Sequence, residues 1–300
     1  MVTVNPSGPQ AVNLSGVTVS LAAVTGGTSL TGQVTLAALA PAGGASVTLS
    51  SSSPSLTLPS SLVIPAGQTT ATFNIGTLPV AAGVSAMITA HSANNVTANV
   101  SIAAPCVQSL TLSALAILGG NGVTATVTLT GAAPVGGINV AITLPSGVTG
   151  PSSVNVAAGA TSATFSLSTS AVAANLSATI QVSVGLCGPI SVGLTINAPI
   201  PVSLTVSPSQ VNLLGNATAT VTLNGAAPAG GLTLTVQTTI LSSLLQLPVN
   251  VTVPAGATQA TFNCKSLISA LSGLLSPVTG TVSVTVGGVT QSAGITLKIL

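Results

Sequence analysis

Three observations predict that this chain of 300 residues is an all-β protein built of three tandem β-sandwich domains. A unit of about 93 residues occurs three times, which is the signature of a repeat architecture. Apolar residues alternate with threonine, serine and asparagine at a period of two, which is typical of half-buried strands. No long segment has a helical period, and the many β-branched residues disfavour helices.

Two short strings define the repeat. The first is an Ala-Pro-x-Gly-Gly turn that starts at Ala40, Ala133 and Ala227. The second ends in Ala-Thr-Phe and contains the only three phenylalanines in the sequence, which are Phe73, Phe165 and Phe262. One phenylalanine at the same place in each unit predicts a core anchor for each sandwich, in preference to a ligand contact.

The turn also gives the domain limits. Counting back from its proline places Val17, Leu110 and Leu204 in the first strand of each unit. The predicted domains are therefore 15–105, 106–200 and 201–300, and residues 1–14 form an N-terminal extension outside the repeat. This extension is either a flexible arm or a strand that docks on a neighbouring subunit.

Within each unit, short strands alternate with turns. Residues 123–130 alternate apolar side chains with threonine, and residues 217–223 do so in the third unit. Glycine-rich turn signals, such as residues 119–122 and 287–288, separate these runs. About seven or eight such strands fit in each unit, and this number together with the unit length predicts a two-sheet sandwich of the immunoglobulin type.

The arrangement resembles the bacterial immunoglobulin-like repeats, which are tandem β-sandwich modules of bacterial surface proteins. The residues that carry the resemblance are the strand openings 109–112 and 203–208, the Ala-Pro-x-Gly-Gly turn, and residues 253–256 leading to Phe262. The resemblance covers nearly the whole chain. It implies the sandwich fold and a role as a spacer, stalk or adhesive arm, although members of such families bear the ordinary surface charge that this chain lacks.

The near absence of charge excludes several classes of function. The sequence has no Asp, Glu or Arg, so it cannot form a carboxylate acid/base pair, a Ser-His-Asp triad or a carboxylate cage for calcium or magnesium. We therefore expect no enzyme and no cofactor. The chain has only two lysines, Lys265 and Lys298, which are too few to neutralise the phosphates of a nucleic acid. It has no Trp or Tyr on which bases could stack, so we expect no nucleic acid partner. No run of about 18 apolar residues occurs, so we expect no membrane insertion.

The three cysteines occupy different places in the repeat. Cys106 precedes the first strand of the second unit, and Cys187 lies in the turn between its last two strands, so both fall at the same pole of an immunoglobulin sandwich. They are a candidate disulfide, and two free thiols are the alternative. Cys264 follows Phe262 by two residues, so alternation predicts a buried apolar side chain in preference to a bridge between chains.

The remaining polar candidates have simple explanations. His91, the sole histidine, is expected to be a solvated loop residue, since a Cys-His dyad with Cys106 would need a contact across a domain junction. Six asparagines begin an Asn-x-Ser/Thr glycan acceptor triplet, although chance explains most of them in so Thr-rich a chain: Asn13, Asn95, Asn99, Asn175, Asn216 and Asn250.

The missing charges favour one class of function. Natural β-sheet proteins protect edge strands with Lys, Glu or Pro and keep net charge away from zero, and this chain has discarded nearly all such protection. We therefore expect copies of the chain to cover one another, as the structural subunit of an extracellular self-assembling filament, appendage or surface layer at a cell or spore surface. The alternative is an adhesin stalk or cell-surface binding module made of immunoglobulin-like spacers.

Overall fold

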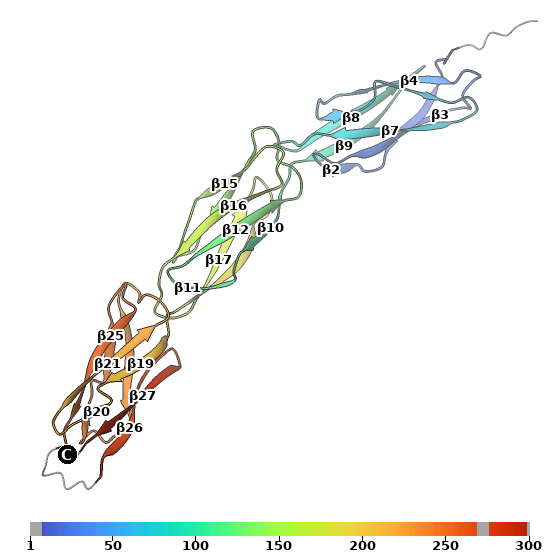
Figure 1. The fold of residues 1–300 in the computed structure, drawn as a ribbon. Coiled ribbons are helices and arrows are strands. Elements are labelled where there is room, and N and C mark those ends of the chain that lie inside the picture. The colour runs from blue at the N-terminus through green and yellow to red at the C-terminus, as the bar shows by residue number, and fades with distance from the viewer. Residues whose placement is uncertain (1–7, 269–275, 299–300) are drawn as a thin grey trace, which may run out of the picture.

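The computed structural model describes residues 8–268 and 276–298. Over this part of the chain it contains 27 strands and no helix. The strands form three sandwiches in succession along a rod, with the N-terminal sandwich (blue) at one end and the C-terminal one (red) at the other (Figure 1). The predicted fold class is confirmed, because each sandwich pairs a four-stranded sheet with a five-stranded one.

Each sandwich contains nine strands in the described residues. The first has β1 (Leu14–Val19), β2 (Ala23–Thr25), β3 (Leu30–Leu36), β4 (Ala45–Ser51), β5 (Leu56–Thr57), β6 (Ser61–Ile64), β7 (Thr70–Thr77), β8 (Val84–His91) and β9 (Asn95–Ala103). The second has β10 (Val107–Leu112), β11 (Ala116–Leu118), β12 (Gly122–Leu129), β13 (Ile138–Thr143), β14 (Val148–Thr149), β15 (Ser153–Val156), β16 (Ser162–Thr169), β17 (Leu176–Ser183) and β18 (Ile190–Asn197). The third has β19 (Pro201–Ser207), β20 (Gln210–Val211), β21 (Asn216–Leu223), β22 (Leu232–Thr238), β23 (Leu245–Gln246), β24 (Asn250–Val253), β25 (Gln259–Ser266), β26 (Val278–Val286) and β27 (Val289–Leu297).

The strand order is the same in all three sandwiches. In the first, the sheets run β1-β3-β7-β5 and β2-β9-β8-β4-β6. The chain changes sheet at every connection until β8, which joins β9 in a hairpin. β2 pairs parallel with β9, so the second strand of the sandwich lies against its last strand. This alternation between two sheets is the immunoglobulin type of connection.

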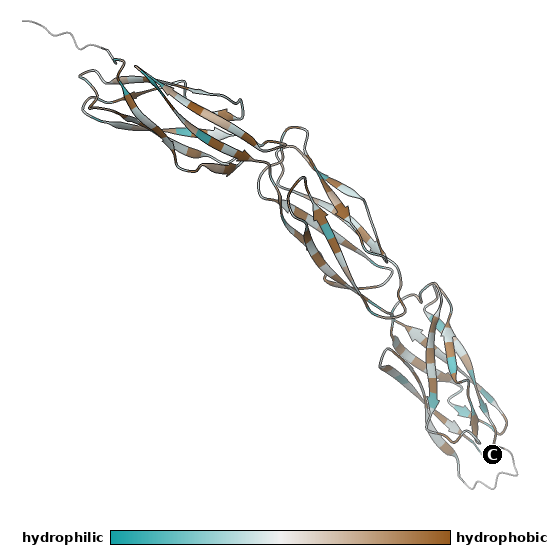
Figure 2. Cartoon of the chain, turned by 180° about the vertical axis from the view of Figure 1, so that it is seen from behind, coloured by the Kyte–Doolittle hydropathy of each residue, from teal (hydrophilic) through white to brown (hydrophobic). Residues whose placement is uncertain are grey.

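Hydrophobic and hydrophilic residues are interspersed along the strands (Figure 2). The core of each sandwich forms from the buried half of this alternating pattern. The three phenylalanines are buried, with exposures of 6% for Phe73 and 7% for both Phe165 and Phe262. Each ring lies across the sheet from a residue with little or no side chain, namely Gly32, Ala125 and Ala219. The partner strand therefore leaves the room that the ring fills, and the apolar clusters of the three sandwiches are separate.

The predicted N-terminal extension is wrong at its C-terminal end. β1 begins at Leu14, which is only 4% exposed, and Gln10 bridges to Ala45 in parallel. The backbone N–H of Gln10 donates to Gly44 O at 3.0 Å. The position of the turn predicts the middle of the first strand but not its start. The prediction therefore leaves out residues 10–14, which pair within the first sandwich. Residues 1–7, where the predicted arm remains, lie outside the described residues.

Short linkers join the sandwiches. β9 ends at Ala103 and β10 begins at Val107, while β18 ends at Asn197 and β19 begins at Pro201. Each linker therefore has three residues with a buried proline in the middle, Pro105 or Pro199. Because proline fixes its own φ angle and the linkers are short, neighbouring sandwiches have little freedom to swing.

Candidate assembly surfaces

The broadest candidate surface is the outer face of the four-stranded sheets. In the second sandwich, Thr124, Thr126 and Thr128 of β12 lie opposite serine and threonine residues of β16. In the third, the amide of Gln259 on β25 donates to Thr222 Oγ1 at 3.1 Å across the sheet. These faces are arrays of hydroxyl and amide groups that do not titrate, so contacts made through them do not depend on pH.

The few charged or titratable groups lie near the two ends of the rod. Lys265 is exposed next to the end of β25, and the backbone N–H of Lys298 donates to Val211 O at 2.7 Å after β27 ends. His91 is exposed at the turn between β8 and β9, where its Nδ1 lies 2.6 Å from Asn95 Oδ1. The expectation of a solvated histidine agrees with this position, since its side-chain contact is local.

The sheet edges are protected by means other than charge. The outermost strands β5, β14 and β23 have two residues each, and β6, β15 and β24 have four. Prolines lie one or two residues from the ends of the four-residue strands: Pro59, Pro65, Pro151, Pro248 and Pro254. At the opposite edge, the first strand of every sandwich has a register irregularity near its start.

Short strands, prolines and bulges all hinder the addition of a further strand. The expectation that this chain has discarded nearly all edge protection is therefore wrong. That expectation rested on the missing charges, whereas the short length of the edge strands and the prolines beside them protect the edges. Only the charged part of the usual protection is absent. Assembly by strand addition is correspondingly disfavoured, and the ends of the rod become the more open surfaces.

The structure joins Cys106 and Cys187 in a disulfide with a Cα–Cα distance of 5.8 Å. The bond ties the linker that leads into β10 to the turn between β17 and β18. In the first sandwich the corresponding connection is made by hydrogen bonds, because Leu14 N donates to Asn94 Oδ1 at 2.6 Å and Asn94 Nδ2 donates to Leu14 O at 3.0 Å. The disulfide is thus a covalent form of a tether that the repeat also makes with an asparagine.

Cys264 is a free thiol in the core of the third sandwich, where its side chain is fully buried. Burial raises the pKa of this thiol to about 11, because the thiolate would lose its hydration. A protonated, enclosed thiol is a poor nucleophile and has no access to another chain.

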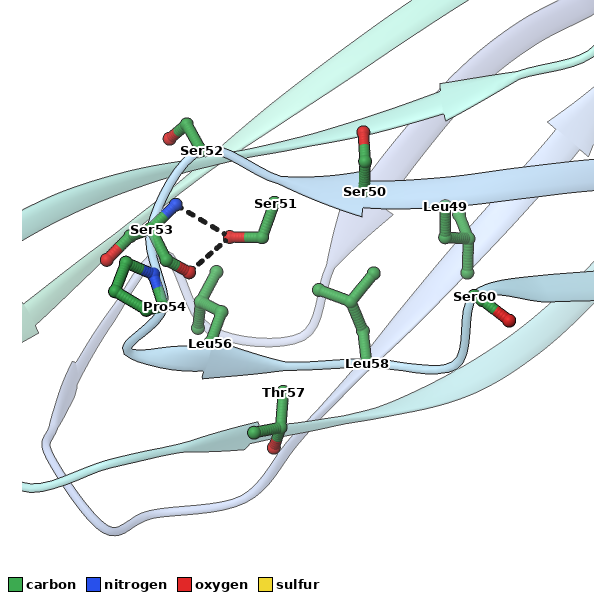
Figure 3. Close-up of a pocket in the computed structure, with 10 residues that line it drawn as sticks. All are labelled: Leu49, Ser50, Ser51, Ser52, Ser53, Pro54, Leu56, Thr57, Leu58 and Ser60. Atoms are coloured by element: carbon green, nitrogen blue, oxygen red, sulfur yellow. Dashed lines mark hydrogen bonds between the residues drawn. The ribbon is translucent and has the colours of Figure 1, made fainter.

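An open groove of about 610 Å³ lies beside β5 in the first sandwich (Figure 3). Serines at the end of β4 and in the loop after it hold the turn: Ser51 Oγ donates to Ser53 O at 2.9 Å and accepts from Ser53 N at 3.1 Å. Ser52 Oγ accepts from Met87 N at 2.9 Å. Because three of its serines are bonded locally and no side chain in its lining titrates, the groove offers little for ligand chemistry.

Within residues 8–268 and 276–298, no group of three or more His, Cys, Asp or Glu side chains lies close enough together to hold a metal ion. In the same described part, no helix has the length and apolar character needed to cross a membrane.

Sequence reasoning missed one set of surface residues, which are leucines at the C-terminal end of the third sandwich. Leu214, Leu241 and Leu267 are 59%, 70% and 36% exposed and come from three different loops. At the same places the first sandwich has glycine and serine in two of these loops, at Gly27 and Ser53. Aligning the three units residue by residue would have revealed this substitution of leucine for small residues.

Comparison with known proteins gives only distant structural similarities. No family model matches this chain, and no curated protein matches it. Among solved structures, the Escherichia coli adhesin FdeC is 14% identical, over 96% of this chain and 99% of that chain, with a TM-score of 0.35. The Yersinia pseudotuberculosis adhesin InvE is 18% identical, over 63% of this chain and 58% of that chain, with a TM-score of 0.36. The D0-D1 domain of intimin is 16% identical, over 64% of this chain and 96% of that chain, with a TM-score of 0.28.

Proposed function

We propose that this chain is the structural subunit of an extracellular filament, appendage or surface layer that assembles from copies of itself through uncharged contacts. The observation that carries the proposal is the surface of the rod, whose long faces present hydroxyl and amide groups and whose only two lysines lie near one end. A dispersed protein normally relies on net charge to keep its copies apart. A rod without that repulsion is suited to close packing against itself.

The construction of the rod supports the same role. Three-residue linkers with buried prolines limit bending, and the disulfide ties Cys106 of the first linker to Cys187 in the turn between β17 and β18. Such a rod transmits tension along the chain rather than unfolding at its joints. The absence of carboxylates from the whole sequence supports a structural rather than an enzymatic role.

Sedimentation of the full chain over a series of pH values and salt concentrations tests the proposal. Because almost nothing on its surface titrates or is screened, we expect assemblies that persist from about pH 3 to 10 and into molar salt. A protein that stays monomeric at high concentration under all these conditions contradicts self-assembly.

That outcome would favour a second function, a passive stalk or spacer of a surface adhesin. The stiff end-to-end arrangement of three sandwiches is the specific observation in its favour, since a spacer needs length and rigidity but no self-contact (Figure 1). Both functions place the chain at a cell or spore surface. They differ in partner, which is the chain itself for the filament and another cell-surface or host component for the stalk.

A further inference from the structure

The chain makes the same kind of joint twice along the rod. Gly131, in the loop after β12, lies against the end of β2, where an added Cβ would come within 2.9 Å of Thr25 Cγ2. Gly225, in the loop after β21, lies in the same way against Leu118 at the end of β11. At each joint, therefore, a loop at the N-terminal pole of one sandwich contacts the end of the second strand of the sandwich before it.

The two halves of this joint are both uncovered at the ends of the rod. In the first sandwich the corresponding loop contains Ala38 and Leu39, and Leu39 is 66% exposed. The residues that match Leu39 at the two joints, Ala132 and Ala226, are only partly exposed. In the third sandwich Asn212 takes the place of Thr25 and Leu118, and it is exposed.

The uncovered C-terminal pole is also the leucine-rich one. Backbone hydrogen bonds hold its three loops together, since Leu214 N donates to Ile268 O at 3.1 Å and Leu267 N donates to Leu244 O at 2.8 Å. Leu241 lies in the third of these loops, between β22 and β23. We call the exposed leucines of the three loops the leucine pole: Leu214, Leu241 and Leu267. Leucines from three loops that backbone hydrogen bonds hold together form an exposed apolar cluster, and such a cluster marks a contact surface.

The backbone of Leu214 adds an independent indication. Its φ angle is +54°, a left-handed conformation that is unfavourable for a residue with a branched side chain. The equivalent turn residues are Gly27 and Gly120, with φ angles of +93° and +95°. Glycine would serve this turn with less strain, so the backbone geometry does not account for a leucine here.

We propose that the leucine pole of one copy docks on the N-terminal pole of the next copy, around Leu39, so that the rods continue end to end. This inference rests on the proposed function and specifies its contact. The two internal joints argue that the partner is a second copy. In each of them the N-terminal pole of one sandwich meets the C-terminal pole of the sandwich before it, and each end of the rod exposes one of these two poles. Ala38 carries a Cβ where the internal joints have glycine, so the contact between copies needs wider spacing, which the leucine side chains fill. Such a head-to-tail contact leaves a free end after every addition and so produces a filament.

The test uses the full chain with one end blocked at a time. Leu39→Asp places a charge on the N-terminal pole, and Leu241→Asp places one on the leucine pole, both at side chains exposed enough to leave the core intact. Leu214→Gly removes a leucine from the leucine pole while relieving its backbone. We expect Leu214→Gly to raise the concentration needed for assembly about 10- to 100-fold, since burying one leucine changes an association constant by that factor. Leu186→Ser, at a fully exposed leucine in the middle sandwich, is the matched control and should assemble normally.

Mixing the two blocked variants decides the geometry. Leu39→Asp and Leu241→Asp should each be monomeric alone, and an equimolar mixture should form one-to-one dimers, because one intact leucine pole and one intact N-terminal pole remain. Light scattering after size-exclusion chromatography measures this. If the unmodified chain assembles but the blocked variants also form filaments, or their mixture stays monomeric, the end-to-end contact is wrong while the filament stands. If the unmodified chain does not assemble at all, the proposed function fails as well.

Discussion

Removing the disulfide should destabilise the second sandwich selectively. Cys106 and Cys187 are 81 residues apart, so their bond closes a loop that contains nearly the whole domain. Chain entropy for a loop of that length gives about 4.5 kcal/mol at 25 °C. A domain of this size has roughly 5–15 kcal/mol of unfolding free energy, so the variant Cys106→Ser/Cys187→Ser should leave the second sandwich marginally stable.

The first sandwich, which has no disulfide, allows the covalent tether to be compared with a hydrogen-bonded one. In the first, Asn94 makes two hydrogen bonds to Leu14 in place of the covalent tether, and Asn94→Ala should cost only about 1–3 kcal/mol. Denaturant unfolding measures the stability, and hydrogen exchange followed by mass spectrometry assigns the loss to a sandwich. Reduction of the unmodified protein should reproduce the effect of the double variant. A loss below about 1 kcal/mol, or one spread equally over the three sandwiches, would refute the tether.

Two further predictions concern the cores. Phe165→Ala should lower the unfolding free energy of the second sandwich by about 3–5 kcal/mol, because the small partner Ala125 cannot fill the space, and denaturant unfolding that showed less than about 1 kcal/mol would contradict the anchor. Burial raises the pKa of Cys264 from 9.0 to about 11, so the stability of the third sandwich should fall as pH rises through this range, since the unfolded chain then releases a proton that the folded chain keeps. Unfolding measured from pH 8 to 11 tests this, and Cys264→Ala should remove the dependence; a pH-independent stability in the unmodified chain would show that the thiol is not desolvated.

Much of the fold could be predicted because it depends on local alternation and on repetition. The threonine-alternating runs around residues 123–130 and the three phenylalanines specify which side of each strand faces inward. The two cysteines could be assigned to one pole because that inference needs only the strand order. The phenylalanine and its Ala-Thr-Phe string recur in every unit, so a single sequence is enough to reveal them.

Other features could not be predicted because they depend on pairing between distant segments. β5 pairs through only Leu56 and Thr57, which is too short for any period to reveal. β1 starts where Leu14 pairs with Leu36, and Gln10 bridges to Ala45 before it, and no local pattern encodes either contact. Edge protection was misjudged for the same reason, since the effect of a proline depends on whether its strand is at an edge.

Electron microscopy of the purified full chain at neutral pH tests the central claim most directly. The account predicts unbranched polar filaments in which three sandwiches belong to each chain and every third joint lies between the leucine pole of one copy and the Leu39 loop of the next. Single rods at all concentrations, or sheets joined side by side through strand edges, would contradict it.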